Sequence, residues 1–428
     1  MHKKLLVISI DSMINEDLEL MRRLPAFCQI MEGASTVHAM TSTYPTLTHS
    51  IHTSIMTGCY PARHGVIHNE QFTPYQKPMP WYQEAELCRV KSLPVCAMEA
   101  GRSVACVYWP VTLGLPVHWN LHRGGIHTKA DDLLQTLRQR ATPGLFDQIY
   151  PYTKDCFEQA DHYYADDSFC CRAISYLVRN YQPDVIYSHL ILVDHARHIG
   201  GVHGKHIDEA YRFLDQQLGE IIQALKENGL WDKTIINITS DHGHLDIDRV
   251  VSINRFLKDH GLQQSDDQGN LLSYDAYCHS CSLSAQIYIR DHDPIRTNYV
   301  KALLWENREL LGIGAILDRE ECRSRYHTDG DYAFMLETDG HSSYSAMPNF
   351  PLITPTNNAD YRTSKATHGH QPERGPQPAF ILRNPFKKTS VQLAHGKLVD
   401  QAPTLAALMD IPMADCDGTA IQELIEIK

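Results

Sequence analysis

The fold of this chain is decided by residues 5–11, Leu-Leu-Val-Ile-Ser-Ile-Asp, near the amino terminus. This run of Leu and β-branched residues is typical of a strand that is buried on both faces of a parallel sheet. The run ends at Asp11, and functional groups in open α/β sheets lie at the carboxyl ends of strands. Because Asp after a strand also often caps a helix, the residue alone leaves both roles open.

Two later segments repeat the pattern of an apolar strand followed by an acidic residue. We predict strands at residues 185–193 and 234–239, which lead into Asp194 and Asp241. Between them, residues 206–228 carry apolar side chains at the 3.6-residue period of an amphipathic helix. Strands that alternate with helices indicate an α/β fold, so we predict a mostly parallel central sheet with helices on both faces.

The length of 428 residues is enough for one elaborated domain or for a core that carries an insertion. We predict that residues 1–255 and 365–428 form the core, with residues 112–167 as a long excursion over the active face. Residues 256–364 differ in character and mix short strand and helix patterns. We therefore expect them to form a small inserted α+β lobe.

The composition is that of an ordinary soluble globular protein, with 43% hydrophobic and 21% charged residues. The formal net charge of −12 argues against binding to nucleic-acid polymers or to anionic membrane surfaces. An anionic substrate would then need a local positive centre, and bound metal is one way to provide it.

The apolar run near the amino terminus is too short for the hydrophobic region of a signal peptide, and no cleavage-site pattern follows it. No stretch is long enough to span a bilayer. The 12 cysteines lack the spacing of a disulfide framework. We therefore expect a reduced, cytoplasmic protein that acts on a small molecule away from membranes, while the sequence leaves assembly into homo-oligomers open.

A stretch rich in hydroxyl groups, residues 45–69, begins Pro-Thr-Leu-Thr-His-Ser-Ile-His. We predict a loop that runs into a short helix ending at Gly58. Thr48 lies near the start of this helix, where unpaired N–H groups and the helix dipole favour an anion. A hydroxyl group there can attack a phosphoryl group if something lowers its pKa.

Candidate metal ligands follow the predicted strands and recur in one later loop. They are Asp11, Asp194, His198, Asp241, His242 and His368. Carboxylate together with imidazole suits a borderline divalent ion such as zinc, whereas Mg²⁺ and Ca²⁺ prefer oxygen ligands. With 25 His in the chain, a single Asp–His pair carries little weight. All six groups, each at a strand end or in a glycine turn, indicate a metal centre, and with the Thr48 oxygen they are enough for two ions.

These motifs resemble those of the nucleotide pyrophosphatase/phosphodiesterase family, within the alkaline phosphatase superfamily. The matching pieces are Ile10-Asp11, the segment 48–69, the strand end at 107–110, Asp194-x-x-x-His198-x-x-Gly201, Ser240-Asp241-His242-Gly243, Thr367-His368-Gly369 and the segment 400–404. They occur in the order of the family and span nearly the whole chain, with the weakest match at residues 112–167. The resemblance implies an alkaline-phosphatase-like core.

Spacing identifies the nucleophile within this resemblance. In the family, the nucleophile precedes the glycine of a Thr-Gly pair by 10 residues and an asparagine by 21, and Thr48 has this relation to Gly58 and Asn69. Thr43 also stands before an aromatic-Pro pair, as the family nucleophile does, but it lies five residues too early. The resemblance therefore selects Thr48.

The resemblance also implies two zinc ions per chain, with Mn²⁺ as the alternative. One ion would be held by Asp11, Thr48, Asp241 and His242, and the other by Asp194, His198 and His368. The implied reaction is hydrolysis of a phosphodiester or pyrophosphate bond through a covalent phosphothreonine on Thr48, with the Asn69 amide as a donor to the phosphoryl oxygens.

Three residues near these motifs depart from the family pattern. Ser12 and Arg197 stand where the family usually has Gly, and Thr48 is followed by His49 in place of an aromatic residue and Pro. None of these changes removes a ligand, but all are expected near the pocket. They leave the choice of substrate open.

Two other functions fit the same residues. A phosphate monoesterase or a phosphonoacetate-type phosphonate hydrolase would use the same metals and Thr48, although a monoesterase normally needs an additional cation to bind the dianion. Arg63, Arg197 and Lys365 are the candidates for that cation. A metal-binding protein without activity is the third interpretation, and the intact nucleophile and ligand set argue against it.

Aromatic residues near the motifs are candidates for stacking on a nucleobase. These candidates are Phe72, Tyr75 and Trp109. Packing in the core or in a loop is the more common use of each such residue. The sequence alone does not separate the two uses.

Overall fold

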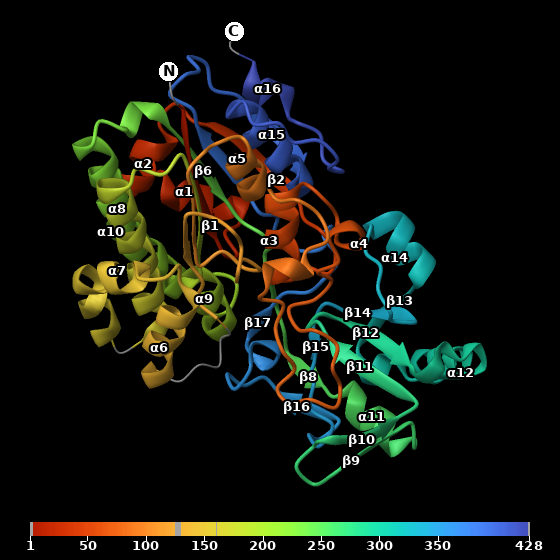
Figure 1. Cartoon of the computed structure of the whole chain (residues 1–428). Helices are drawn as coiled ribbons and strands as arrows, with labels where there is room; N and C mark the ends of the chain where they lie inside the picture. The colour runs from red at the N-terminus through yellow and green to blue at the C-terminus, as the bar shows by residue number, and fades with distance from the viewer. Residues whose placement is uncertain (1–2, 125–129, 160, 427–428) are drawn as a thin grey trace.

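The computed structural model describes residues 3–124, 130–159 and 161–426 (Figure 1). Its central sheet has eight strands, and their bounds are β1 (Lys4–Ile10), β2 (Ser35–Thr41), β3 (Val104–Val107), β4 (Trp119–Leu121), β5 (Val185–Leu190), β6 (Thr234–Thr239), β18 (Phe380–Arg383) and β19 (Gln392–Lys397). Their order is β19–β2–β18–β6–β1–β5–β3–β4. The neighbours pair in parallel except at β18, which is antiparallel to β2 and β6. The predicted α/β fold with a mostly parallel sheet is confirmed.

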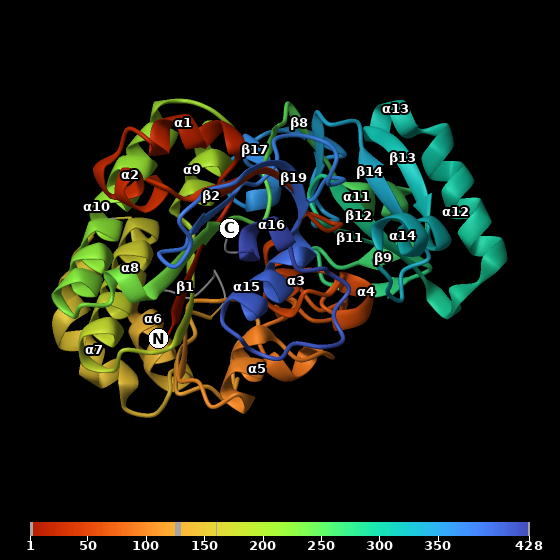
Figure 2. The same ribbon diagram turned by 90° about the horizontal axis from the view of Figure 1, so that it is seen from above.

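Helices cover both faces of the sheet (Figure 2). On one face lie α1 (Leu18–Met21), α2 (Pro25–Met31), α6 (Ala130–Arg140), α7 (Leu145–Thr153), α8 (His162–Asn180), α9 (Leu192–Gly200) and α10 (Lys205–Glu227). On the other face lie α3 (Thr48–Thr57), α5 (Leu93–Glu99) and α15 (Gln401–Leu408). In β1, Leu6 and Ile8 belong to the first apolar core, and Leu5 and Val7 belong to the second. This division follows from the alternation of side chains along a strand.

The carboxyl ends of three neighbouring strands meet at one edge of the sheet. Ile10 at the end of β1 is in register with Leu190 at the end of β5. On its other side, Ser9 is in register with Thr239 at the end of β6. Parallel pairing therefore brings the segments that follow these strands to the same place, as open α/β sheets commonly do at their functional edge.

The strand predicted at residues 185–193 is longer than the strand in the structure, β5 (Val185–Leu190). It ends at Leu190, and Asp194 lies in the first turn of α9. The Asp167 carboxylate accepts hydrogen bonds from the N–H groups of Ile191 (2.9 Å) and Leu192 (3.0 Å), which satisfies the first donors of the helix. Residues 191–193 are apolar, so their composition did not distinguish a helix start from a continued strand.

The described part of the segment 112–167 contains more regular secondary structure than its sequence pattern indicated. It contains β4, α6, α7 and the start of α8, and only residues 125–129 and 160 lie outside the described residues. Leu137, Phe146 and Ile149 join the same apolar core as α8 and α10. This segment therefore extends one helical layer of the molecule.

A smaller α+β unit lies beside the sheet, at the lower right of Figure 1. Its antiparallel sheet has the order β11–β12–β14–β13, formed by β11 (Ala276–Ser280), β12 (Ser284–Ile289), β13 (Ile313–Asp318) and β14 (Phe334–Thr338). The helices α11 (Ile253–Asp259), α12 (Pro294–Glu306), α13 (Arg308–Leu311) and α14 (Arg319–Tyr326) accompany this sheet. The unit has an apolar core of its own, to which Leu257, Val300 and Leu336 belong.

Short strands and helices connect the parts of the molecule. They are α4 (Pro61–His64), β7 (Leu245–Asp246), β8 (Arg249–Val251), β9 (Gln263–Ser265), β10 (Leu271–Tyr274), β15 (Ser342–Tyr344), β16 (Ile353–Pro355), β17 (Ala366–Thr367) and α16 (Gln422–Ile425). Strands β15 and β16 flank β8, and β17 pairs with β7. Among the described residues, no helix combines the length and the apolar character needed to cross a membrane. Nine of the twelve cysteines are buried, as expected for small core residues.

A buried ion pair ties α9 to the loop that follows β1. The Arg197 side chain is fully buried, and its Nη2 lies 2.5 Å from Asp17 Oδ2. Arg197 Nε donates to the carbonyl oxygen of Ser12 (3.1 Å), while the Asp17 carboxylate also accepts from the Tyr211 hydroxyl (2.6 Å). The guanidinium group is therefore used within the core and does not face a substrate.

We expect the substitution Asp17→Asn to lower the free energy of unfolding by roughly 3–5 kcal/mol, because it leaves the Arg197 charge buried without a counterion. The matched control is Asp259→Asn, which breaks the half-exposed pair with Arg255 (2.9 Å) and should cost less than about 1 kcal/mol. Urea denaturation measures both values. Equal losses in the two variants would contradict the structural role of the buried pair.

Candidate active site

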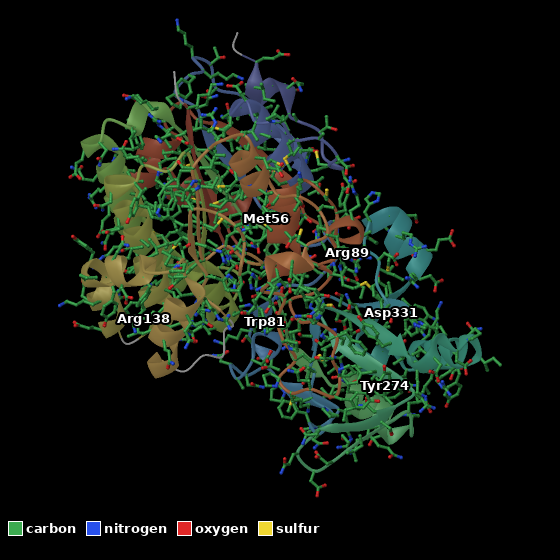
Figure 3. All side chains as sticks on the ribbon, viewed as in Figure 1. Met56, Trp81, Arg89, Arg138, Tyr274 and Asp331 are labelled. Carbon is green, nitrogen blue, oxygen red and sulfur yellow. The ribbon has the colours of Figure 1, made fainter. Side chains whose placement is uncertain are left out.

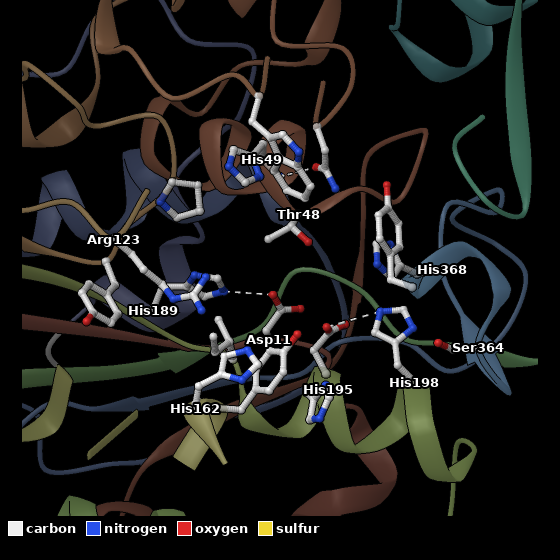
Figure 4. A pocket seen from close by; sticks show the side chains of 18 of the residues that line it. Asp11, Thr48, His49, Arg123, His162, His189, His195, His198, Ser364 and His368 are labelled. Atoms are coloured by element: carbon white, nitrogen blue, oxygen red, sulfur yellow. Dashed lines mark hydrogen bonds and ion pairs between the residues drawn. The ribbon is translucent and has the colours of Figure 1, made fainter. Parts of the chain in front are cut away.

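A cavity of about 290 Å³ opens at the functional edge of the sheet (Figure 4). Residues from several distant segments line it, and those predicted from the sequence are Asp11, Thr48, Asn69, Asp194, His198 and His368. Asp241 and His242 are fully buried beside these residues. Thr43, the alternative nucleophile, does not line the cavity.

The first group of candidate ligands consists of Asp11, Thr48, Asp241 and His242. His242 Nε2 lies 3.1 Å from Asp241 Oδ2, 3.6 Å from Asp11 Oδ1 and 3.4 Å from Thr48 Oγ1. Among the described residues, Asp11 Oδ1 and Asp241 Oδ2 find no hydrogen-bond partner although both atoms are buried. Buried carboxylate oxygens that lack a donor and face an imidazole nitrogen are suited to a cation.

The second group consists of Asp194, His198 and His368, together with His244, which the sequence analysis did not single out. One ligand atom from each of these four residues lies within 4.8 Å of the others. His198 Nδ1 donates to the carbonyl oxygen of Ala366 (2.8 Å), and His368 Nδ1 donates to that of Thr46 (2.7 Å). In the neutral form of both rings, these bonds place the proton on Nδ1 and leave Nε2 free to bind metal.

The two groups are adjacent. Ligand atoms of Asp11, Asp194 and His242 also lie within 4.8 Å of one another, so this trio connects the first group to the second. The donor set of carboxylates, imidazoles and one hydroxyl is chemically suited to holding metal ions. All seven residues that the sequence proposed as ligands thus lie in one place.

Burial and the charges of neighbouring groups shift the pKa values of the candidate ligands. Burial raises the pKa of Asp11 well above its usual range, with a further contribution from Asp241, and it raises the pKa of Asp241 to about 7. Burial also disfavours the charge on Asp194, but His198 and His244 together outweigh it and hold the pKa of that carboxyl well below its usual range. Burial lowers the pKa of His368 to about 4, so this ring is neutral and available as a ligand at neutral pH.

Thr48 is placed by the start of α3. Leu47 before it has an extended backbone, and the helix begins at Thr48. One turn later, His52 Nδ1 donates to the carbonyl oxygen of Thr48 (2.8 Å), and His52 Nε2 accepts from the Ser9 hydroxyl (2.9 Å). Thr48 is therefore fixed at a helix N-terminus, beside the end of β1.

Asn69 is oriented by the residue that follows Thr48. Its Oδ1 accepts the N–H of His49 at 2.9 Å. Because the oxygen is engaged in this way, the NH₂ group of Asn69 remains as a donor at the wall of the cavity. Such a donor can bind a phosphoryl oxygen beside the Thr48 hydroxyl.

His368 reaches the site on a loop whose path requires glycine. At Gly369, φ is +100°, and a Cβ atom would lie only 1.7 Å from the carbonyl oxygen of Cys281. The same turn donates the N–H of Gly369 to Thr46 Oγ1 at 2.9 Å. The loop after the smaller α+β unit is thus held against the segment that leads to Thr48.

A sequence model of the type I phosphodiesterase/nucleotide pyrophosphatase family matches residues 5–370. The chain belongs to this family. It is therefore a hydrolase of phosphoric esters, in a family that is generally metal-dependent. The sequence resemblance to the family is confirmed.

Solved structures with the same fold include three of ectonucleotide pyrophosphatase/phosphodiesterase 5, each 16% identical to this chain. An inactive murine form in complex with AMP has a TM-score of 0.70, covering 99% of this chain and 100% of its own. A second structure of the murine protein has a TM-score of 0.69 and the same coverage of both chains. The human protein has a TM-score of 0.69, with 99% of each chain covered.

The three aromatic residues proposed for substrate stacking do not line the cavity of this phosphodiesterase-family chain. Phe72 stacks on Tyr288 at 3.5 Å in the smaller unit, and Tyr75 is 64% exposed. Trp109 is fully buried against His52. Proximity in sequence to the motifs therefore did not indicate proximity to the site, and packing explains Phe72 and Trp109.

Other aromatic side chains form the wall. Trp81, near the centre of the molecule in Figure 3, lines the cavity together with Tyr108, Tyr163 and Tyr361. Tyr163 stacks on His195 with ring centroids 3.5 Å apart. These residues come from four separate segments, so no local sequence pattern could have assembled them.

The candidate cations for a phosphate dianion are placed elsewhere. Arg63 pairs at the surface with Asp415 and Asp417, Arg197 is buried as described above, and Lys365 does not line the cavity. Among the described lining residues, the guanidinium at the wall is that of Arg123. Its Nε and Nη2 bind Asp166 Oδ2 at 2.9 Å and 2.5 Å, so its charge is already neutralised.

Three histidines that support the site were missed from the sequence. His189 Nε2 donates to Asp11 Oδ2 (2.9 Å), as the dashed line in Figure 4 shows. His52 follows Thr48 by one helical turn, and His244 follows His242 by two residues. The spacing of His52 and the strand position of His189 were available signals, but in a chain with 25 His neither pattern is specific.

We expect the metal-free protein to lose stability as pH rises, because the buried Asp241 carboxyl becomes ionised. Its pKa in the folded chain is about 7, above the ordinary value of 3.8, so the stability it contributes is complete below the ordinary pKa and is lost as pH rises through about 7. Between about pH 5 and pH 8, EDTA-treated wild type should therefore lose more free energy of unfolding than EDTA-treated Asp241→Asn. Parallel curves for the two proteins in urea denaturation would contradict this assignment.

Proposed function

We propose that this chain is a two-zinc phosphodiesterase or nucleotide pyrophosphatase that works through a covalent phosphothreonine on Thr48. The observation that carries the proposal is the position of the Thr48 hydroxyl. It stands at the N-terminus of α3 and lines the same cavity as Asp11, Asp194 and His368. A nucleophile, an anion-binding helix end and two sets of metal ligands thus converge on one point.

Zinc ions at these two groups, or Mn²⁺ in their place, would lower the pKa of the Thr48 hydroxyl and offset the charge of the phosphoryl oxygens. Thr48 Oγ1 forms a bond to phosphorus as the bond from phosphorus to the leaving oxygen breaks on the opposite side. N–H groups at the start of α3 and the Asn69 amide donate to the non-bridging oxygens. Water then cleaves the phosphothreonine, which restores the Thr48 hydroxyl and releases the phosphoryl product.

The wall of the cavity favours a diester over a monoester. A monoester dianion calls for a free cationic side chain, and the Arg123 guanidinium on this wall is paired with Asp166. A diester or pyrophosphate link carries less charge at the reacting phosphorus, and the aromatic wall of Trp81, Tyr108 and Tyr163 offers a surface for a nucleobase. The murine relative in complex with AMP supports a nucleotide as part of the substrate.

The expected effect of Thr48→Ala is a loss of diester hydrolysis of at least about 10³-fold, because the attacking oxygen is removed. Thr43→Ala is the matched control, since Thr43 is buried in the same segment without lining the cavity. This control should keep activity within about threefold of wild type, as expected for a residue outside the reaction. Initial rates on an aryl nucleotide diester measure both, and an active Thr48→Ala protein would overturn the covalent mechanism.

Substrate class is tested by comparing an aryl phosphate diester, an aryl phosphate monoester and phosphonoacetate on the zinc-loaded enzyme. We expect kcat/KM for the diester to exceed that for the monoester by at least about tenfold, because the wall supplies no free cation for a dianion. Steady-state kinetics give the ratio. A preference for the monoester or for the phosphonate would select the alternative function at the same site.

A further inference from the structure

We propose that His244 is a fourth protein ligand in the second metal group, where it binds the same ion as Asp194, His198 and His368. This inference rests on the two-metal centre proposed above and adds a residue to it. His244 is fully buried, and it lies outside the ligand set implied by the family resemblance.

The distances around His244 Nε2 are those of atoms that share an ion. This nitrogen lies 3.2 Å from Asp194 Oδ1 and 3.4 Å from His198 Nε2. In a tetrahedral zinc site with bonds of 2.0–2.1 Å, neighbouring ligand atoms are about 3.3 Å apart. The separation of the two ring nitrogens exceeds the ordinary hydrogen-bond range, and His198 already carries its proton on Nδ1.

The backbone places His244 opposite His368. Strands β7 and β17 are antiparallel, with Leu245 in register with Thr367. His244 immediately precedes the first of these residues, and His368 immediately follows the second. His198 bonds to the carbonyl oxygen of Ala366 in the same strand pair. A single two-residue ladder therefore holds all three imidazoles of the group.

Ser12 completes the environment of His244. Its Oγ lies 2.6 Å from His244 Nδ1, and its backbone N–H donates to Asp241 Oδ1 (3.1 Å). The φ angle of Ser12 is 63°, in the left-handed region, where a residue with a Cβ atom has a higher conformational energy than glycine. Histidines that bind metal usually have a hydrogen-bond partner on their second nitrogen, and the Ser12 hydroxyl fills that role.

Closeness of ligand types alone does not make a metal site in this molecule. A second cluster, His68, Glu70 and His279, has the same ligand types within 4.8 Å. There, Arg362 Nη2 lies 2.8 Å from Glu70 Oε2 and supplies the cation, and both nitrogens of His68 are hydrogen-bonded. Among the described residues, the ion-pair partners of Asp194 are instead the imidazoles of His198 and His244.

A fourth protein ligand changes what the second ion can do. A catalytic zinc usually has three protein ligands and one open position. With His244 bound, the ion has four, so a phosphoryl oxygen enters only by expanding the coordination. We therefore expect the second ion to be held more tightly than three ligands would hold it.

The test compares metal binding in the wild type, His244→Leu, Ser12→Ala and the control His370→Gln, in which a buried histidine outside the group is replaced. Chelator competition gives the dissociation constants of the two Zn²⁺ ions, and the visible spectrum of the Co²⁺-loaded protein reports the coordination. We expect His244→Leu to weaken one of the two ions by at least about 100-fold and to change the Co²⁺ spectrum. Ser12→Ala should weaken the same ion by roughly 10- to 100-fold.

The double variant Ser12→Ala/His244→Leu should bind no more weakly than His244→Leu alone, because Ser12 acts through that ring. His370→Gln should match the wild type. Wild-type affinity and an unchanged spectrum in folded His244→Leu or His244→Gln would overturn the proposal. If His198→Ala weakens one ion in that case, the two-metal centre stands without His244, whereas no metal binding by the wild type would overturn both.

Discussion

The carboxyl groups of Asp11, Asp194 and Asp241 are crowded at one edge of the sheet, two of them buried and the third facing the cavity. Burial, together with repulsion between the neighbouring carboxylates, raises the pKa of Asp11 and Asp241, so their charged forms require nearby positive charge. Burial lowers the pKa of His242, His244 and His368, so these rings are neutral at neutral pH and do not supply that charge, whereas Asp194 raises the pKa of His198. Bound cations, as proposed above, would supply this charge and would also give an acidic chain a positive centre for a phosphate ester.

The main features of the fold were predictable because β1 and β6 are buried on both faces and leave a continuous apolar pattern in the sequence. The end of β5 was not predictable, since the helix start at residues 191–193 is as apolar as the strand and depends on Asp167, a partner from α8. The helices of the segment 112–167 were not predictable for a similar reason. Its apolar side chains pack against α8 and α10, which come from other parts of the sequence.

In the site, the motifs located the proposed ligands and Thr48 because most of them lie beside a strand end or in a glycine turn, while Asp194 and His198 lie four residues apart in one helix. The pocket wall was not readable in the same way. Phe72, Tyr75 and Trp109 were suggested by their position near the motifs, whereas Trp81, Tyr108, Tyr163 and Tyr361 meet only through tertiary packing. His244 was missed although it stands two residues from His242, because its place beside His198 and His368 depends on the pairing of β7 with β17.

Strands β7 and β17 lie on opposite sides of the smaller unit in the sequence, so their pairing can form only after that unit has been synthesised. Asp11, Asp194 and Asp241 are synthesised before the smaller unit, and His368 with β17 is synthesised after it. A nascent chain that ends within the smaller unit has β7 without its partner and the second group without His368. Strands β18 and β19 and helix α15 of the core also follow the smaller unit in the sequence, so the central sheet and the second group are both completed only when the carboxyl-terminal segment has been made.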